Sequence, residues 1–312
     1  SSSRGLGDVY KRQDRNDQVI ATLKSVHPDG LFEVRLPLPS IAYRLRLSEA
    51  KQTRVIDDPY SFPSPLGDLD RHLMKEGSLQ RLEQKLGANP MQLNGTDGVH
   101  FAVWAPNAAR VSVIGGFNQW DGRRHPMRRH SQNGIWDIFI PGLACGEHYK
   151  FELLDANHQL LPHKADPFAR FMEAAPGNAS IVHQDDYQWQ DRDWIDRRKQ
   201  NTTLERPMSI YEVHLGSWRR DDENQPLGYR ELADSLVNYV SEMAYTHIEL
   251  LPLTEHPFDG SWGYQPVGLF SPTSRFGGPE DLKYFIDACH QRDIGVIMDL
   301  SLIHISEPTR LQ

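Results

Sequence analysis

The sequence predicts a multidomain chain in which a β-sandwich precedes an α/β unit with a parallel sheet. The first observation is a series of short apolar–polar alternations between Gly98 and Val182, separated by turn residues, which is typical of sandwich strands. The second is the alternation of strand-like and helix-like periods from Met208 onward, which indicates right-handed crossovers. This alternation fits a doubly wound sheet and a (β/α)₈ barrel equally well.

Two segments precede the sandwich. Residues 14–56 contain short alternating stretches, such as Leu31 to Leu36, that indicate strands with one buried face. We interpret this segment as the remnant of an N-terminal β-domain. Residues 57–97 are expected to form a linker, because prolines crowd its first part. Leucines at helical spacing predict one helix in the linker, from Asp70 to Leu86.

The remaining strands and helices are predicted from the same spacing of apolar residues. Strands are predicted in the sandwich at residues 99–104, 110–114, 135–140 and 148–153. Residues 183–207 are polar and predict a surface linker anchored by Trp189 and Trp194. In the α/β unit, strands are predicted at residues 209–215, 246–253 and 294–299, and helices at residues 229–243 and 281–290.

The stretch from His256 to Gln265 joins the second strand of the α/β unit to its second helix, where α/β folds keep binding chemistry. It contains three aromatic rings and one carboxylate among glycines and a proline. Flat apolar faces with polar edges suit sugar rings, so this loop is a candidate carbohydrate site. The alternative is an aromatic-rich loop that packs on its own domain.

Both ends of the chain are expected to be artificial. Residues 3–13 and 300–310 can be encoded by one DNA sequence and by its reverse complement, and that DNA resembles a sequencing adapter. We therefore treat residues 1–13 and 300–312 as adapter-like and exclude them from functional reasoning. A genomic read across the codons of Asp299 and Leu300 tests this expectation, because residues 300–312 followed by a stop codon would contradict it.

Composition excludes several classes of function. The 312 residues carry a net charge of −8, which gives no reason to expect binding to nucleic acids or anionic membranes. We find no signal peptide, no apolar run that could span a bilayer, and no metal-like or disulfide-like spacing of the two cysteines. We therefore expect a cytoplasmic protein with no metal ion and no other cofactor.

Five runs of the sequence form a recognisable set: Phe101–Pro106, Phe117–Met127, Ile210–Arg219, Glu249–Pro252 and His256–Gly277. Together they resemble bacterial 1,4-α-glucan (glycogen) branching enzymes of the α-amylase clan. The resemblance covers about residues 56–299. It implies an isoamylase-N-like, immunoglobulin-like carbohydrate-binding module at residues 98–182. It also implies the first three units of an α-amylase-type (β/α)₈ TIM barrel at residues 208–299.

The resemblance also implies a reaction. Branching enzymes cleave an α-1,4 bond of a glucan and transfer the chain to a 6-hydroxyl with retention of configuration. Retention requires a carboxylate nucleophile and a second carboxyl group that serves as acid and then base. In this family both lie on later barrel strands, so no catalytic residue is expected in this chain. The implied partner is an α-glucan such as glycogen or amylose, and full-length relatives are expected to be monomeric.

The implied substrate contacts lie in the α/β unit. Tyr264 matches the family tyrosine that stacks on the sugar beside the cleaved bond, and its loop also carries Asp259, Trp262 and Gln265. Asp299 matches the aspartate that begins the first motif shared by the family.

Two histidines are less specific. His304 has the family spacing from Asp299, but the intervening Trp-Val-Pro-Gly is missing and the segment is adapter-like, so we treat it as a coincidence. His214 ends the first predicted strand of the α/β unit, and a satisfied core histidine fits there at least as well as a site residue.

In the module, Asn118, Trp120 and Lys150 match the glucan-contacting region of glycogen-binding relatives. Relatives that bind tightly carry a second tryptophan in the next hairpin, where this chain has Asn157–Gln159. The alternative interpretation is a structural spacer with Trp104 and Trp136 in its core.

Three functions remain open: a fragment of a branching enzyme, a non-catalytic glucan-binding fragment, and another clan enzyme such as a debranching enzyme. The loop from His256 to Gly277 favours the first over the third.

The 312 residues expressed alone should form no α-1,6 linkage from amylose, because no catalytic carboxylate is expected in them. Proton NMR of the glucan product measures this, and a new α-1,6 anomeric signal would refute the expectation. Poor solubility is also expected, because three barrel strands leave an open hydrogen-bonding edge.

Overall fold

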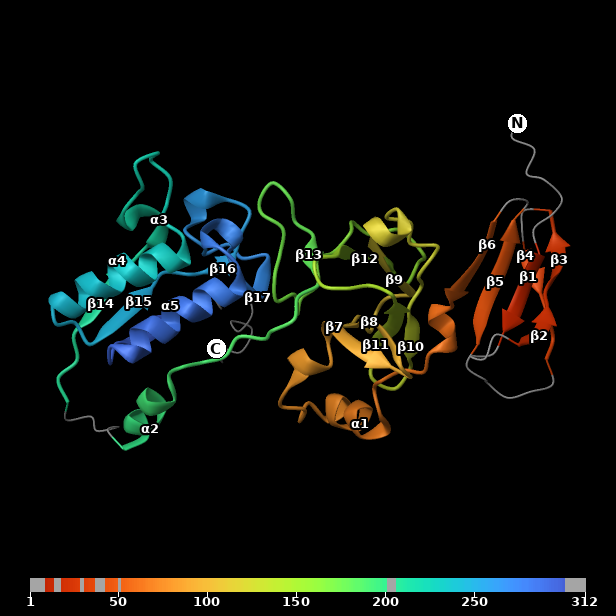
Figure 1. Cartoon of the computed structure of the whole chain (residues 1–312), viewed down its shortest axis with the longest axis horizontal. Coiled ribbons are helices and arrows are strands. Elements are labelled where there is room, and N and C mark those ends of the chain that lie inside the picture. The colour runs from red at the N-terminus through yellow and green to blue at the C-terminus, as the bar shows by residue number, and fades with distance from the viewer. Residues whose placement is uncertain are drawn as a thin grey trace.

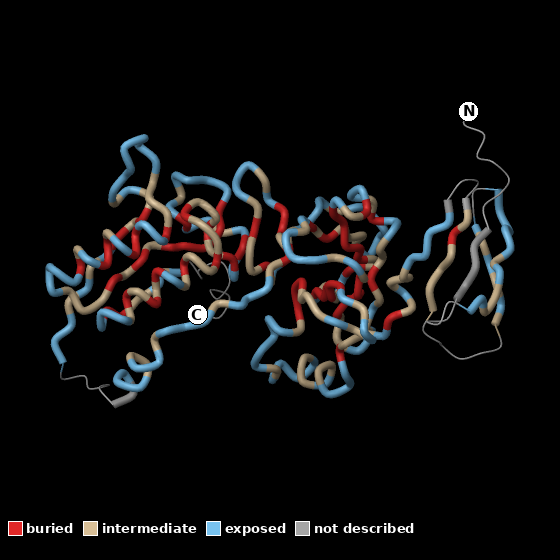
Figure 2. Tube along the Cα trace, in the orientation of Figure 1, coloured by how far each residue is buried: buried red, intermediate tan, exposed pale blue. Residues whose placement is uncertain are grey.

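The computed structural model describes residues 9–13, 18–28, 31–36, 43–49, 52–200 and 206–300. In Figure 1 these residues form three units in a row: an N-terminal sheet, a central pair of sheets and a C-terminal α/β unit. Buried residues concentrate in the central and C-terminal units (Figure 2). The adapter-like residues 1–8 and 301–312, His304 among them, lie outside the described residues.

The N-terminal unit is an antiparallel sheet with the strand order β2-β1-β5-β6. Its strands are β1 (Val9–Gln13), β2 (Val19–Thr22), β5 (Arg44–Glu49) and β6 (Gln52–Asp57). A separate hairpin joins β3 (Lys24–His27) to β4 (Leu31–Glu33). β1 falls within the adapter-like segment 1–13, yet its backbone pairs with both β2 and β5. The sheet therefore takes in more of the chain than the predicted β-domain at residues 14–56.

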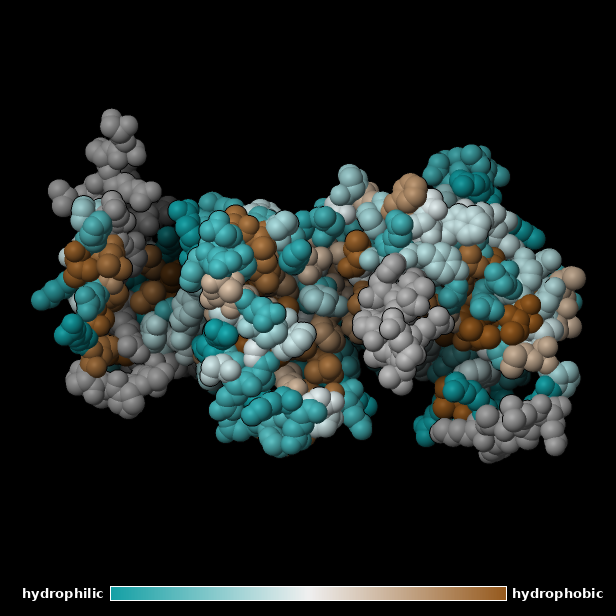
Figure 3. Space-filling view, turned by 180° about the vertical axis from the view of Figure 1, so that it is seen from behind, coloured by the Kyte–Doolittle hydropathy of each residue, from teal (hydrophilic) through white to brown (hydrophobic). Residues whose placement is uncertain are grey.

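This sheet leaves apolar side chains at the surface, visible as brown areas in Figure 3. Among the residues from 18 to 57 whose burial is described, Leu47 is the one buried apolar residue. The exposed ones in the sheet and its hairpin are Val19, Val26, Leu31, Val55 and Ile56.

The linker before the sandwich contains less helix than predicted. After the 3₁₀ turn η1 (Pro59–Ser61), helix α1 spans Asp68–Glu76. It ends at Gly77, whose φ of 71° is left-handed and whose N–H bonds to carbonyls of the last turn. The helix predicted up to Leu86 is therefore wrong beyond Glu76, because glycine adopts this terminating conformation at little cost. A further 3₁₀ turn, η2 (Leu82–Gln84), follows.

The central unit is a sandwich of two antiparallel sheets, as predicted, with strand orders β10-β11-β8-β7 and β13-β12-β9. The predicted strands correspond to β8, β9, β11 and β12, and the first sheet also includes β7, ahead of the expected start at Gly98. The strands are β7 (Gly87–Leu93), β8 (Thr96–Trp104), β9 (Arg110–Gly115), β10 (Arg128–His130), β11 (Ile135–Pro141), β12 (His148–Leu154) and β13 (Ser180–Ile181).

Only one of the two tryptophans expected in the sandwich core lies there. Trp136 is 4% exposed and packs with Phe101 and Tyr149 in the core cluster. Trp104 is 62% exposed, and its Nε1 donates to the carbonyl of Asn133 at 3.1 Å. The expectation of a core position is therefore wrong for Trp104, which is the last residue of β8 and lies outside the core.

Asp137 forms a buried polar centre in the first sheet of the sandwich. Its carboxylate accepts hydrogen bonds from Ser64 Oγ (2.6 Å), His100 Nε2 (3.0 Å) and His130 Nε2 (2.8 Å). Burial alone raises the pKa of this carboxyl, but the three hydrogen bonds outweigh burial and hold the pKa well below its usual range. The network fastens the linker, through Ser64, to strands β8, β10 and β11.

The polar segment after the sandwich packs against helix α5 (Pro279–Gln291), which comes later in the chain. It contains a helix that was not predicted, α2 (Arg192–Gln200). Trp194 stacks on His290 with ring centroids 3.7 Å apart, and Asp191 pairs with the same histidine at 2.7 Å. Trp194 is therefore an anchor, as predicted. Trp189 is 45% exposed and meets Tyr187 edge-on, so it contributes less to this attachment.

The C-terminal unit has a parallel sheet in the order β14-β15-β18. Helices α4 and α5 pack on it through a core that includes Leu236 and Phe285, both fully buried. The loop after β15 contains a small hairpin of β16 and β17 that was not predicted. Besides α5, the strands and α-helices of this unit are β14 (Ile210–Val213), α3 (Leu215–Trp218), α4 (Tyr229–Glu242), β15 (His247–Leu250), β16 (Thr254–Glu255), β17 (Gly268–Pro272) and β18 (Gly295–Met298).

The sandwich and the C-terminal unit meet at that hairpin. Phe168 stacks on Phe270 of β17 with ring centroids 5.2 Å apart and an interplanar angle of 14°. Met172, which is 1% exposed, lies against Gly268, where an added Cβ would come within 2.4 Å of the methionine sulfur. These contacts place the sandwich directly against the loop that follows β15.

Replacing Asp137 with alanine should lower the free energy of unfolding by about 3 kcal/mol or more, because Ser64, His100 and His130 would lose their buried acceptor. Urea denaturation followed by tryptophan fluorescence measures the change. Asp68→Ala is the control, since this fully exposed carboxylate pairs with Arg71 in contact with solvent and its loss should lower the free energy of unfolding far less. Similar small losses in both variants would contradict the assigned role of Asp137.

Candidate functional site

The candidate site lies where the carboxyl ends of β14, β15 and β18 meet. His214 directly follows β14, the loop 251–278 follows β15, and Asp299 directly follows β18. The N–H of Asp299 donates to the carbonyl of Leu250 at 2.9 Å, which continues the pairing of the strands beyond their ends. Parallel strands deliver their carboxyl ends to one edge of a sheet, so residues distant in sequence come together here.

Tyr264 and Asp299 form a direct hydrogen bond at this edge. The hydroxyl of Tyr264 donates to Asp299 Oδ2 at 2.5 Å. This bond, partial burial and the negative charge of Asp299 together raise the pKa of Tyr264 to about 12. The phenol therefore stays protonated at neutral pH, and the residue remains 39% exposed. The structure thus joins two residues that the sequence predicted as separate contacts.

Trp262 lies beside His214, with ring centroids 5.5 Å apart and planes inclined by 28°. Trp262 is 56% exposed and has a left-handed φ of 53°. The next residue, Gly263, has a φ of 87°, and a Cβ there would come within 2.3 Å of the Pro252 carbonyl oxygen. The backbone therefore turns tightly here and directs Trp262 outward. His214 belongs to this site and not to the core.

Partial burial, and secondarily the charge of His256, lower the pKa of His214 below its usual 6.5. Both effects disfavour the charged form of the imidazole beside Trp262. Its Nδ1 lies 2.9 Å from the hydroxyl of Ser217, which fixes the plane of the ring.

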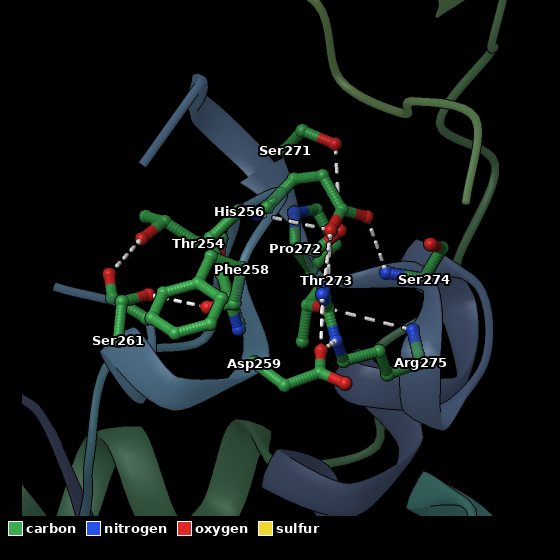
Figure 4. A network of polar contacts seen from close by, with 12 residues as sticks. Thr254, His256, Phe258, Asp259, Ser261, Ser271, Pro272, Thr273, Ser274 and Arg275 are labelled. Carbon is green, nitrogen blue, oxygen red and sulfur yellow. Dashed lines mark hydrogen bonds and ion pairs between the residues drawn. The ribbon is translucent and has the colours of Figure 1, made fainter. Parts of the chain in front are cut away.

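A buried ion pair joins the two ends of the hairpin loop (Figure 4). The side chain of Glu255 is 3% exposed, and Arg275 Nη1 donates to its Oε1 at 2.9 Å. The same carboxylate accepts from the backbone N–H groups of His256 (3.0 Å) and Ser274 (2.7 Å), and from the hydroxyl of Thr273 (3.3 Å). Glu255 is thus a buried charge with a nearly complete set of donors.

Arg275 also reaches a second carboxylate. Its Nε and Nη2 lie 2.7 Å and 2.6 Å from Oδ1 of Asp259, whose side chain is 85% exposed. Asp259, predicted as a glucan contact, is therefore half of an ion pair at the outer surface of the loop. We call Glu255, Arg275 and Asp259 the loop clasp. The sequence analysis did not predict Glu255 or Arg275 as site residues. The sequence shows only that two residues of opposite charge lie at the two ends of one loop, which is a weak indication of an ion pair.

A cavity of about 710 Å³ lies between the sandwich and the same loop. Lys150 of β12 and Gln265 of the loop, predicted for two different sites, both line it. The ammonium group of Lys150 donates to the amide oxygen of Asn178. The other lining residues are His163, Lys164, Ala165, Pro167, Met172, Pro266, Val267 and Leu269.

The other two residues predicted in the module lie outside the lining of this cavity. Asn118 is 1% exposed: its Oδ1 accepts from the N–H of Gly115 and its Nδ2 donates to the carbonyl of Val113, both at 2.9 Å. Asn118 therefore holds the turn after β9. Trp120, which follows in this turn, is 40% exposed and presents an aromatic surface of the module.

Within the described ranges, no group of three or more His, Cys, Asp or Glu side chains is arranged to hold a metal ion. None of the helices in these ranges combines the length and the apolar character that crossing a membrane requires.

The phenol of Tyr264 should titrate near pH 12, and Asp299→Asn should lower its pKa toward 10.0, because the amide removes the negative charge. The folded-state pKa is raised, so the stabilisation from this bond is present below pH 10 and is lost as the pH rises toward 12. Ultraviolet difference titration against Tyr264→Phe measures the pKa. Asp259→Asn, in the same loop, should leave it unchanged, and an equal shift in both variants would contradict the assignment.

Two family models match separate parts of the chain. Residues 85–169 match carbohydrate-binding module 48, the isoamylase N-terminal domain, and residues 232–311 match the α-amylase catalytic domain. A crystal structure of a putative α-amylase from Salmonella typhimurium aligns over 69% of this chain and 32% of its own, with a TM-score of 0.53 and 26% identity. The α/β unit is therefore the beginning of a (β/α)₈ barrel, which decides between the two folds that the sequence pattern left open.

Three curated relatives are 1,4-α-glucan branching enzymes. The protein from Rhodospirillum rubrum is 53% identical over 94% of this chain, that from Rubrobacter xylanophilus 52% over 92%, and that from Pseudomonas putida 51% over 92%. The chain spans about 40% of the length of each of them. With its sandwich module, its barrel strands and this identity, the chain belongs to the 1,4-α-glucan branching enzyme family of the α-amylase clan.

Proposed function

We propose that the whole protein is a 1,4-α-glucan branching enzyme of glycogen biosynthesis and acts in the cytoplasm. It cleaves α-1,4 bonds and transfers the released chain to a 6-hydroxyl, with retention through a covalent glycosyl-enzyme. Identity above 50% to curated branching enzymes over more than nine tenths of the chain supports this proposal. The chain itself contributes a glucan-binding surface, and we assign it no nucleophile and no general acid.

The hydrogen bond between Tyr264 and Asp299 is the observation that carries the proposal for this chain. It fixes the hydroxyl end of the tyrosine at the carboxyl ends of two barrel strands while the side chain stays partly exposed. A pyranose can stack on such a ring, and Trp262 offers a second aromatic surface in the same loop. Asp299, Gln265 and Asp259 supply polar groups for sugar hydroxyls.

The module contributes a second set of contacts in this proposal. Trp120 stacks on glucan at the module surface, and Asn118 holds its turn. Lys150 bonds glucan hydroxyls from the cavity that it shares with Gln265. The module match over residues 85–169 supports this assignment.

Tyr264→Ala should raise the Kd of the chain for maltoheptaose by about tenfold, equivalent to about 1.4 kcal/mol, because the stacking surface is lost. Titration followed by tryptophan fluorescence measures the affinity. Tyr284→Ala is the matched control, since Tyr284 is 37% exposed but lies on α5 against Arg230. Equal affinities of the wild type and Tyr264→Ala would remove Tyr264 from the site.

The whole protein, supplied with amylose, should produce α-1,6 linkages that proton NMR detects as new anomeric signals. Shortened amylose without new linkages would indicate a hydrolase of the clan and would contradict branching.

A further inference from the structure

The loop that carries Trp262 and Tyr264 has little apolar packing of its own. Trp262, Tyr264 and Phe258 are 56%, 39% and 61% exposed, and none of them belongs to the barrel core cluster. The whole connection, residues 251–278, is long for a βα loop, and its chain entropy opposes a single conformation. Leu253 and Phe276 anchor the two ends of this connection in the barrel core, so it is the part from Phe258 to Tyr264 that needs contacts other than hydrophobic burial.

The loop clasp makes such contacts at three separated points. Glu255 lies in β16 at the start of the hairpin loop, Asp259 lies in the 3₁₀ turn η4 (Asp259–Ser261) at its outer part, and Arg275 lies in η5 (Ser274–Phe276) after its end. Figure 4 shows the side chain of Arg275 beside Asp259, and Nη1 of the same guanidinium group donates to Glu255. One side chain thus spans 20 residues to Glu255 and 16 residues to Asp259.

We propose that Arg275 and Glu255 are positioning residues for glucan: their ion pair, extended to Asp259, fixes the loop on which Trp262 and Tyr264 meet the sugar. This inference rests on the proposed function, because it assigns the clasp to the glucan site of that enzyme. The two residues act through the loop and not by touching the substrate.

The geometry requires arginine and not simply a positive charge. Arg275 contacts Glu255 and Thr273 through Nη1, and Asp259 through Nε and Nη2. A planar fork satisfies these directions at once, whereas a lysine ammonium is a single point on a flexible stem. Lysine at position 275 retains the charge but cannot hold both carboxylates in this arrangement.

Burial of Glu255 makes its ion pair with Arg275 necessary for the closed loop. Its carboxylate is 3% exposed, and without Arg275 it would keep three donors but lose its only cationic partner among the described residues. A buried charge in that state favours an opened loop in which water reaches the carboxylate. The strands β14, β15 and β18 pack through a separate apolar cluster and do not depend on this ion pair.

The test compares Arg275→Lys and Arg275→Met in the full chain with Arg197→Met, which removes an arginine that pairs with Asp293 on the outer surface of the C-terminal unit. Amide hydrogen exchange is measured without glucan, and the Kd for maltoheptaose is measured by fluorescence titration. We expect exchange across residues 256–267 to become about tenfold faster in both Arg275 variants and unchanged in the control. The Kd should rise by about tenfold, with no rescue by lysine.

Four results would overturn the proposal. Unchanged exchange at residues 256–267 would show that the clasp does not order the loop. Faster exchange with an unchanged Kd would show that loop order does not serve glucan binding. Equally faster exchange in β14, β15 and β18 would indicate general destabilisation, and full rescue by Arg275→Lys would indicate a role of charge alone. Failure of the wild-type chain to bind maltoheptaose would instead refute the glucan-binding role proposed for this chain, while the exchange data would still decide whether Arg275 orders the loop.

Discussion

Parallel pairing of β14, β15 and β18 is the constraint on which the rest of the candidate site depends. Its register aligns Val213 with Leu250 and Leu250 with Met298. The residues that follow these three positions must therefore lie at one edge of the sheet, whatever their own preferences. His214 and Asp299 are placed by this constraint alone, whereas Trp262 and Tyr264 also need a defined path of the loop between β15 and α5.

The regular elements could be predicted because burial imposes a period on the sequence. In α4, the fully buried Leu232, Leu236 and Val240 recur at helical spacing on one face. Features that do not depend on the burial of a periodic face, such as the end of α1 and the helix α2, could not be predicted in this way. Gly77 ends α1 in the middle of a leucine repeat, and α2 is a polar helix held by one stacked tryptophan, so neither leaves a periodic signal.

The candidate site was predictable only in part, for a similar reason. Tyr264 and Trp262 stand out because aromatic residues in a glycine-rich loop are unusual, and their loop position follows from the neighbouring strand and helix. The contact between Glu255 and Arg275 joins positions 20 residues apart with no repeating pattern, so only the folded chain shows it. The shared cavity of Lys150 and Gln265 depends on how two domains pack, which no single segment encodes.

Gly268 shows how domain packing can restrict a sequence far from the domain that causes the restriction. An added Cβ at this position would come within 2.4 Å of the sulfur of Met172, so a larger residue would require that side chain to shift toward the cavity that it lines. A barrel that evolved without a sandwich at this face would be free of that restriction. Residue 268 is therefore a marker of domain history: homologous barrels that keep the sandwich in this place should retain glycine, and those that have lost it should accumulate larger residues.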